Sequence, residues 1–202
     1  MKYVIAELNI KDVEQIVAVH IQSFDFFFLT SLGGNFLNTY YSSCLKSSQT
    51  IGLGLFSNNG NLEGFAIGSL NSSGYHIKIL LNNLHLFFFS LIKIILTRPS
   101  VIIRLLLNVN KSPNKKDKKD YAELLSIAVL PNLKGSGYGK LLLNKFEVIA
   151  KNRGANSCAL TTDFYYNESV ISFYKSNNYK IYYDFVTYPS RRMYKMIKNL
   201  SN

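Results

Sequence analysis

The chain has 202 residues and a formal net charge of +11, and 48% of its side chains are apolar. This length suits one domain with a full hydrophobic core, and the apolar content excludes an intrinsically disordered chain. The positive charge indicates either an anionic partner, such as nucleic acid, an acidic membrane surface or a phosphorylated ligand, or a lysine-rich bias of the source proteome. Two cysteines, Cys44 and Cys158, are too few for a disulfide framework and lack zinc-ligand spacing.

The N-terminal region predicts a strand followed by a helix. The stretch KYVIAEL (2–8) alternates as a strand does, and the chain turns polar too soon for a signal peptide, so the reducing cytoplasm is the expected location. His20 is expected to be a satisfied core histidine rather than a ligand, because it lies on the apolar face of the helix. Asp12 is predicted to cap this helix, whose apolar face holds Val13, Ile16, Val17, Ile21 and Phe24.

Residues 24–70 predict an aromatic loop, a Gly-Gly break, a second short helix and a hairpin. The two hairpin strands, 50–57 and 61–70, are joined by Asn-Asn-Gly, which is typical of a tight turn between antiparallel strands. These elements precede an apolar segment that is unlike the rest of the chain.

This apolar segment, 84–107, is interrupted by Lys93, Arg98 and Pro99. Its uninterrupted part has about 13 residues, which is fewer than the ~20 that span a bilayer. We therefore expect two buried or interfacial helices broken at Pro99 rather than a transmembrane helix. The basic run that follows, 111–120, contains Pro and Asn and predicts a solvated loop.

The second half of the chain alternates predicted strands and helices. No internal repeat or linker divides the sequence, so we expect one α/β domain over residues 1–202 with a mixed sheet. The predicted elements are a strand at 121–130 closed by Pro131, a helix after the glycine loop that stops at Gly154, a strand at 157–163, a helix at 167–178 with Asn177 or Asn178 in the left-handed cap conformation, and strands at 179–188 and 191–198.

The stretch LKGSGYGK (133–140) predicts a phosphate site. Glycines at the start of a helix leave backbone amides uncovered, and the helix dipole favours negative charge there. A P-loop is excluded, because Lys134 and Leu141 stand where that motif needs Gly and Ser or Thr. A dinucleotide fingerprint is weak, because Lys140 stands where its third glycine belongs. The glycines of the loop are Gly135, Gly137 and Gly139.

The residues around this loop resemble the GCN5-related N-acetyltransferase (GNAT) family. That family has a strand ending in V-x-P, then R/Q-x-x-G-x-G/A at a helix start, and later N-x-x-x-x-x-x-Y in a helix. Two departures keep the main features: Lys134 replaces Arg or Gln and retains the charge, and Asn178 replaces a glycine at a position of positive φ. The matching residues are Val129, Pro131, Lys134, Gly137, Gly139, Asn167 and Tyr174.

The resemblance implies an α/β fold with a mixed, mainly antiparallel sheet flanked by helices. An apolar helical insert, about 74–118, would lie between the third and fourth strands. It also implies acetyl-CoA as co-substrate and no metal. Asn167 is expected to contact the CoA arm or merely to cap its helix. The backbone groups expected to hold the pantetheine arm and the acetyl carbonyl are on Ile127, Ala128 and Val129, and those expected to hold the pyrophosphate are on Lys134, Gly135, Ser136, Gly137, Tyr138, Gly139 and Lys140.

The resemblance also suggests the acid and the base of the reaction. Tyr174 stands at the position of the family's general acid, which protonates the leaving thiolate, and the alternative is a buried core aromatic. Glu123, on the predicted strand before the loop, is the base candidate, acting directly or through water, and the alternative is an exposed strand carboxylate. Such groups typically contribute ~10²–10⁴-fold each.

The acceptor is indicated by the stretch FDFFFLTSLGGNFLNTYY (24–41). It resembles the pattern F-L-x-x-L-G-x-x-F-L-x-x-Y-Y of GNAT members linked to bacterial surface-polysaccharide biosynthesis, which implies an amino sugar carried on a nucleotide or lipid phosphate. The alternatives are a protein or peptide amine and a non-catalytic acetyl-CoA-binding module. A nucleic-acid-binding protein is disfavoured because no binding motif is present. The segment 84–107 is expected to wall the acceptor site and to contact either a second subunit or a membrane surface.

Overall fold

The computed structural model describes residues 3–25, 27–97, 107, 117–118 and 120–201. Its strands appear in the order that the sequence patterns predict, whereas a short helix, Phe28–Ser31, lies in the stretch predicted as an aromatic loop. The elements are β1 (Val4–Glu7), η1 (Ile10–Asp12), α1 (Val13–Ser23), α2 (Phe28–Ser31), α3 (Gly34–Leu45), β2 (Thr50–Phe56), β3 (Leu62–Ser69), α4 (Tyr75–Asn82), α5 (Leu84–Thr97), β4 (Ala122–Val129), η2 (Pro131–Leu133), α7 (Tyr138–Asn152), β5 (Ser157–Asp163), α8 (Glu168–Ser176), β6 (Lys180–Thr187) and β7 (Arg191–Asn199).

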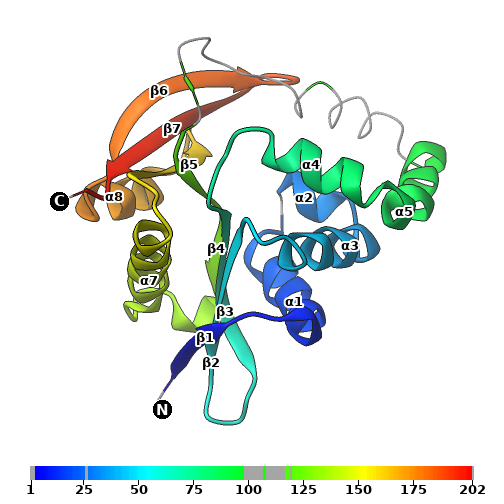
Figure 1. Cartoon of the computed structure of the whole chain (residues 1–202), viewed down its shortest axis with the longest axis horizontal. Coiled ribbons are helices and arrows are strands. Elements are labelled where there is room, and N and C mark those ends of the chain that lie inside the picture. The colour runs from blue at the N-terminus through cyan, green and yellow to red at the C-terminus, as the bar shows by residue number, and fades with distance from the viewer. Residues whose placement is uncertain (1–2, 26, 98–106, 108–116, 119, 202) are drawn as a thin grey trace.

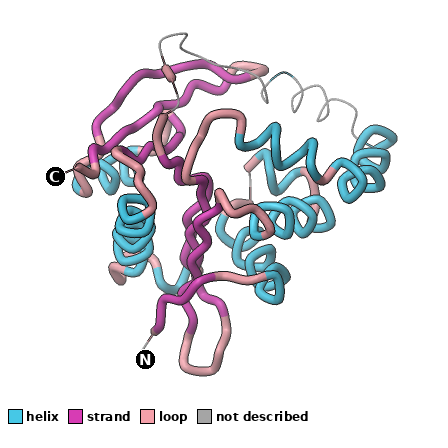
Figure 2. Tube along the Cα trace, viewed as in Figure 1, coloured by secondary structure: helices cyan, strands magenta, loops and turns pink. Residues whose placement is uncertain are grey.

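Within the described residues, seven strands form one sheet in the order β1-β2-β3-β4-β5-β7-β6. Every neighbouring pair is antiparallel except β4 and β5, which run parallel. The strands lie between two groups of helices, with α7 and α8 on one side and α1 to α5 on the other (Figures 1 and 2). This arrangement confirms the predicted mixed, mainly antiparallel sheet flanked by helices.

Both faces of the sheet carry a core. Helix α7 buries Leu142, Leu143 and Phe146 completely, in the spacing expected of one helix face. Phe146 packs against β3 only because position 68 is glycine: a Cβ there would lie 2.5 Å from Phe146 Cζ. On the opposite face, α1 and α3 pack on β3 and β2, around buried Phe65.

Two local predictions receive a definite answer. Asp12 does not cap α1 through its side chain; it accepts a hydrogen bond from the Asn9 backbone at 2.8 Å and completes the capping box of η1, so that prediction is wrong. Of the two residues predicted to take the left-handed conformation, Asn178 does so, with φ +69°.

In the sequence, helices α4 and α5 follow β3 and precede β4, which confirms the helical insert between the third and fourth strands. Helix α5 is fixed to the rest of the molecule by Phe87, which is buried and packs against Phe36 with ring centroids 5.2 Å apart. The predicted break at Pro99 and most of the basic run 111–120 lie outside the described residues. No helix in the described ranges is long and apolar enough to cross a membrane.

Candidate active site

The geometry of the site begins where β4 leaves β5. Along these two strands, both fully described, the parallel pairing covers three residue pairs and ends at Leu124. The register between β4 and β3 shifts at the same place: Gly68 pairs with Leu124 and Ile67 with Ser126, which leaves Leu125 as an extra residue. Such bulges bend a strand and are common beside active sites. The backbone of β4 beyond the bulge is therefore open on the side of β5.

A cavity of about 780 Å³ lies in this opening. It runs from the end of β4 along the glycine loop to the inner face of α8. The segment after α1 closes its other side. Its lining residues are Ser23, Phe24, Phe27, Ile127, Ala128, Val129, Leu133, Lys134, Gly135, Gly137, Gly139, Lys140, Asn167, Ser169, Val170, Phe173, Tyr174, Ser176 and Asn177. We call this cavity the cofactor cleft.

The glycine loop supplies an anion site to the cofactor cleft. Gly135 and Gly137 have φ of +79° and +86°, a conformation that other residues rarely adopt, and open space lies where their Cβ atoms would be. Gly137 is the N-cap of α7, a helix of 15 residues, whose first backbone N–H groups have no acceptor within the helix. Lys134 and Lys140 add two cations to the lining. Amides, dipole and lysines all favour a phosphate here.

Two residues of the predicted phosphate loop have side chains elsewhere. Ser136 and Tyr138 are not among the residues that line the cofactor cleft. The Ser136 hydroxyl donates a hydrogen bond to the Leu133 carbonyl, and Tyr138 packs edge-on against Tyr3 with ring centroids 4.6 Å apart. Any contact of these two residues with a ligand in the cleft is thus through the backbone.

Helix α8 brings Tyr174 and Asn167 to the cofactor cleft. Tyr174 is 7% exposed, and burial raises the pKa of its phenol, so it holds its proton at neutral pH. Asn167 makes no side-chain cap on α8, so the capping alternative is wrong. Its Nδ2 instead donates to Thr162 Oγ1 at 2.7 Å and to the Asp163 carbonyl at 3.1 Å, which ties the start of α8 to the end of β5.

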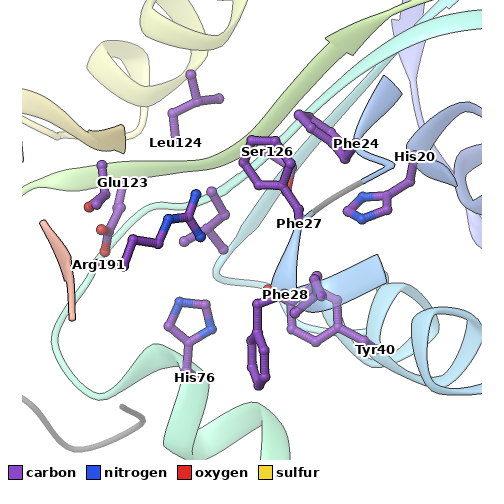
Figure 3. Close-up of a pocket in the computed structure, with 13 residues that line it drawn as sticks. His20, Phe24, Phe27, Phe28, Tyr40, His76, Glu123, Leu124, Ser126 and Arg191 are labelled. Carbon is purple, nitrogen blue, oxygen red and sulfur yellow. The ribbon is translucent and has the colours of Figure 1, made fainter. Parts of the chain in front are cut away.

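A second cavity, of about 300 Å³, adjoins the first one, and Figure 3 shows the side chains that line this second cavity. Phe24 and Phe27 line both cavities, so these two rings form a common wall. The elements that contribute side chains are distant in the sequence. The lining residues are His20, Phe24, Phe27, Phe28, Leu29, Tyr40, His76, Glu123, Leu124, Leu125, Ser126, Thr161 and Arg191. We call this cavity the acceptor cavity.

The two fully charged side chains of the acceptor cavity are both ion-paired. Glu123 pairs with Lys195 and accepts a hydrogen bond from Ser72. Burial raises the pKa of Glu123, but the Lys195 ammonium and these hydrogen bonds outweigh burial, so its pKa is lowered and the carboxylate is ionised at neutral pH. The alternative of an exposed strand carboxylate is wrong, because the side chain is 14% exposed.

Arg191 carries the other charge, at one side of the acceptor cavity. Its Nε and Nη2 donate to the two carboxylate oxygens of Asp163, at 2.5 and 2.6 Å. Its guanidinium also lies over the Phe27 ring, 5.2 Å from the centroid. A bidentate pair of this kind fixes the guanidinium and neutralises it. The cavity is therefore polar at its ends, aromatic along its walls and nearly neutral.

The comparisons with known proteins agree on one family. Residues 103–179 match the model of the acetyltransferase (GNAT) family. Among solved structures, the chain is similar to the ribosomal-protein-S18-alanine N-acetyltransferase from Escherichia coli, at 16% identity, covering 100% of this chain and 96% of that chain with a TM-score of 0.63. The chain therefore has the fold of the GNAT acetyltransferases, and the family's model matches its central part.

Two further solved structures share the GNAT fold with this chain. The PaiA N-acetyltransferase from Thermoplasma acidophilum, solved in complex with coenzyme A, is 19% identical over 98% of this chain and 99% of that chain, with a TM-score of 0.62. Naa20 from Chaetomium thermophilum, solved with a bisubstrate analogue, is 18% identical over 97% of this chain and 86% of that chain, with a TM-score of 0.59. No curated protein matches the chain.

The GNAT motif residues and the predicted base lie in different cavities. The structure brings Ile127, Ala128, Val129, Tyr174 and most of the glycine loop together in the cofactor cleft, and it places Glu123 in the acceptor cavity. The sequence prediction missed the common wall of Phe24 and Phe27 and the placing of Arg191 and His76. A signal existed for the wall only, in the aromatic run that follows the first helix.

Proposed function

We propose that this protein transfers the acetyl group of acetyl-CoA to the primary amine of an amino sugar carried on a nucleotide or lipid phosphate. The observation that carries the proposal is the meeting of two unlike cavities at one aromatic wall. One has a phosphate-binding loop and an open strand edge, and the other has a small aromatic chamber. Acetyl transfer from a large phosphorylated donor to a compact amine needs both.

Acetyl-CoA fits the cofactor cleft part by part. Its pyrophosphate suits the amides at the start of α7 together with Lys134 and Lys140. Its extended pantetheine arm suits the edge of β4 that β5 leaves open, where Ile127 to Val129 line the cleft. The thioester then lies near the common wall, at the mouth of the acceptor cavity.

The proposed chemistry uses three groups in sequence. The acceptor nitrogen attacks the thioester carbonyl, and a backbone amide of residues 127–129 stabilises the oxyanion that forms. The amine gives up a proton to Glu123, directly or through water. The carbon–sulfur bond then breaks, and Tyr174 donates its proton to the leaving thiolate of CoA. The raised pKa of Tyr174 supports its part, since an acid must carry its proton into the reaction.

The acceptor cavity supports an amino sugar as substrate. Its volume of about 300 Å³ is at the low end for small-molecule sites and suits one ring-sized group. Four aromatic side chains, from Phe24, Phe27, Phe28 and Tyr40, offer faces for the apolar side of a sugar ring. Because Glu123 and Arg191 are already paired, a charged phosphate carrier would stay outside the cavity.

A protein amine is the second proposed acceptor class. One of the similar solved structures supports it, because the Escherichia coli protein is named for acetylating an alanine of ribosomal protein S18. A peptide N-terminus is also a compact primary amine. The acceptor cavity would then take one N-terminal residue.

The experiment that separates these classes is acetylation of a mixed amine panel. In separate reactions, the protein and acetyl-CoA are incubated with one class of amine at a time. The classes are amino-sugar nucleotides, free hexosamines and peptides with different N-terminal residues, and the products are identified by mass spectrometry. We expect a gain of one acetyl group on an amino-sugar nucleotide. Acetylation of peptides alone would establish the second class, and CoA binding without transfer to any amine would indicate a non-catalytic module.

We also propose that helix α5 packs against a second copy of this chain. Its residues Leu84, Ile92 and Leu96 are exposed although apolar, while Phe87 fixes the helix to the fold. An apolar face held rigidly in this way usually marks a contact with a partner. None of the described α5 residues lines the acceptor cavity. Among the described residues of the insert, His76 of α4 is the one that lines it.

A further inference from the structure

His20 is the buried titratable group that the proposed chemistry leaves unused. It lies on α1, one helical turn before Phe24, and its ring centroid is 4.8 Å from that of Phe24. The side chain is 2% exposed and lines the acceptor cavity. Figure 3 shows the imidazole projecting from α1 toward the space between the aromatic walls, on the side opposite Arg191 and Glu123.

The two ring nitrogens of His20 have unequal surroundings. Nδ1 lies 2.7 Å from the hydroxyl oxygen of Tyr41, and that hydroxyl donates in turn to Ser126 Oγ at 3.5 Å. A hydroxyl has one proton, so in the arrangement in which Tyr41 donates to Ser126 it accepts from His20, and the proton of the imidazole is on Nδ1 in that tautomer. Nε2 then carries a lone pair. Nε2 is buried and has no hydrogen-bond partner within the described part of the chain.

An unpaired buried nitrogen is unfavourable in a resting core. Leaving such a group without a partner costs free energy, so native structures rarely keep one without a reason. His20 does not relieve this cost by ionising, because burial lowers its pKa to about 4 and keeps the imidazole neutral at neutral pH. What remains is a neutral acceptor of hydrogen bonds at the wall of the cavity that receives the amine.

We propose that His20 Nε2 accepts a hydrogen bond from an N–H of the acceptor amine and so orients the amine's lone pair toward the thioester. The proposal rests on the proposed acetyl transfer and adds a substrate-orienting residue to it. Tyr41, held by Ser126, is the positioning residue that fixes the tautomer of His20. A neutral primary amine has two N–H groups and one lone pair, so one N–H can be held while the lone pair attacks.

The position of Ser126 supports this role. Ser126 directly precedes Ile127, which lines the cofactor cleft, so the His20–Tyr41–Ser126 chain lies at the junction of the two cavities. Glu123 lies three residues back along β4, about 10 Å of extended strand. His20 therefore holds the reacting nitrogen, and water carries its proton toward Glu123.

The test compares three variants in the full-length protein. His20→Asn keeps a donor near the Nδ1 position and loses Nε2, His20→Gln places an amide oxygen near the Nε2 position, and Tyr41→Phe removes only the positioning hydroxyl. Rates are measured with acetyl-CoA and D-glucosamine or benzylamine as acceptors, and CoA affinity by calorimetry. We expect His20→Asn to lower kcat/KM for the acceptor about 10- to 100-fold. His20→Gln should recover part of this loss, Tyr41→Phe should lose less than His20→Asn, and CoA affinity should not change.

A second measurement tests the proposed role of His20 without relying on enzymatic turnover. In protein labelled with ¹⁵N-histidine, the His20 nitrogen signals should show Nδ1 protonated and Nε2 bare, and saturating benzylamine with CoA should shift the Nε2 signal. Unchanged kcat/KM in His20→Asn, a proton on Nε2, or an Nε2 signal that benzylamine leaves unshifted would each overturn the proposal. If the wild type acetylates no amine, the proposed function fails, and the nitrogen signals alone then decide the role of His20.

Discussion

The cofactor cleft and the acceptor cavity share a wall but are built by opposite means. The cleft takes most of its proposed anion-binding groups from the main chain, held in place by glycines with positive φ, with the lysines Lys134 and Lys140 beside them. The acceptor cavity takes its groups from side chains on seven elements, α1 to α4, β4, β5 and β7, and on the segment between α1 and α2. A main-chain site fails when the backbone changes shape, whereas a side-chain site fails when the chemistry of one residue changes. Donor binding and acceptor chemistry should therefore be separable by mutation.

The largest expected effect breaks the chemistry and leaves the donor site intact. Tyr174→Phe removes the proposed proton donor and nothing else, so kcat should fall by about 10²–10⁴ while CoA affinity stays constant. Steady-state kinetics and calorimetry check this. Tyr179→Phe is the matched control, because Tyr179 packs on Tyr174 with ring centroids 5.7 Å apart but lines neither cavity. Equal rates in both variants would make Tyr174 a core aromatic only.

The second prediction breaks the donor site through the backbone. Gly137→Val forces a branched side chain onto φ +86°, in a place where its bulk faces the cleft, and should weaken CoA binding by about 100-fold, near 2.7 kcal/mol. Gly60→Val is the control, since Gly60 has φ +79° and equally open surroundings in the β2–β3 turn. Both variants should lose similar stability, and calorimetry should show weakened CoA binding in Gly137→Val alone. Unchanged affinity in Gly137→Val would contradict the phosphate site.

The third prediction concerns the charge pair beside the acceptor. Glu123→Gln leaves Lys195 buried without its carboxylate, which should destabilise the fold by about 3 kcal/mol and lower Tm by roughly 6–12 °C. Since the folded pKa of Glu123 is lowered from 4.5, the stability of the pair is present above about pH 4.5 and is lost as the pH falls through the folded value. The difference in Tm between wild type and variant should therefore shrink in acid.

A double variant separates the structural and the catalytic part of Glu123. Replacing Lys195 by Met in the Glu123→Gln background removes the orphaned charge and should restore most of the Tm. If Glu123 is the proton acceptor, kcat stays about 10²-fold low in both variants. Recovery of kcat together with Tm would show that Glu123 acts only through the fold.

The smallest expected effect lies outside both cavities. Replacing Ile92 and Leu96 of α5 by Asp should change the mass seen by light scattering from that of a dimer to that of a monomer, with kcat unchanged. Val148→Asp is the control, an apolar residue of α7 that is 51% exposed on the other side of the sheet. An unchanged dimer, or an unchanged monomer that instead loses liposome binding, would contradict the proposed contact between two copies.

The same contrast explains what the sequence could predict. The elements of the cofactor cleft were predictable because glycines, V-x-P and the later Asn167 and Tyr174 stand at fixed spacings in one stretch of chain. The sheet followed from strand-like runs such as 157–163, which matches β5 as observed. The acceptor cavity was not predictable, because Arg191 and His76 meet only through the fold and no spacing relates them.

His20 shows the limit most clearly. The apolar face of the first helix correctly indicates that His20 is buried, but burial alone does not say whether both nitrogens are satisfied. That depends on the Tyr41 hydroxyl, which is 21 residues away and reaches Nδ1 only. The prediction that Asp12 caps the same helix was wrong for a similar reason, because Asn9 and Asp12 form a local turn that the helical pattern does not reveal.

The common wall of Phe24 and Phe27 constrains how the enzyme could be redirected to a new substrate. Any change to those rings alters the shape of both cavities at once, so a variant selected for a different acceptor would also bind its donor differently. Tyr40 and His76, in contrast, line the acceptor cavity alone. A library aimed at altered acceptor preference should therefore randomise these two positions and leave the phenylalanines in place, so that each selected change can be interpreted as a change in acceptor recognition.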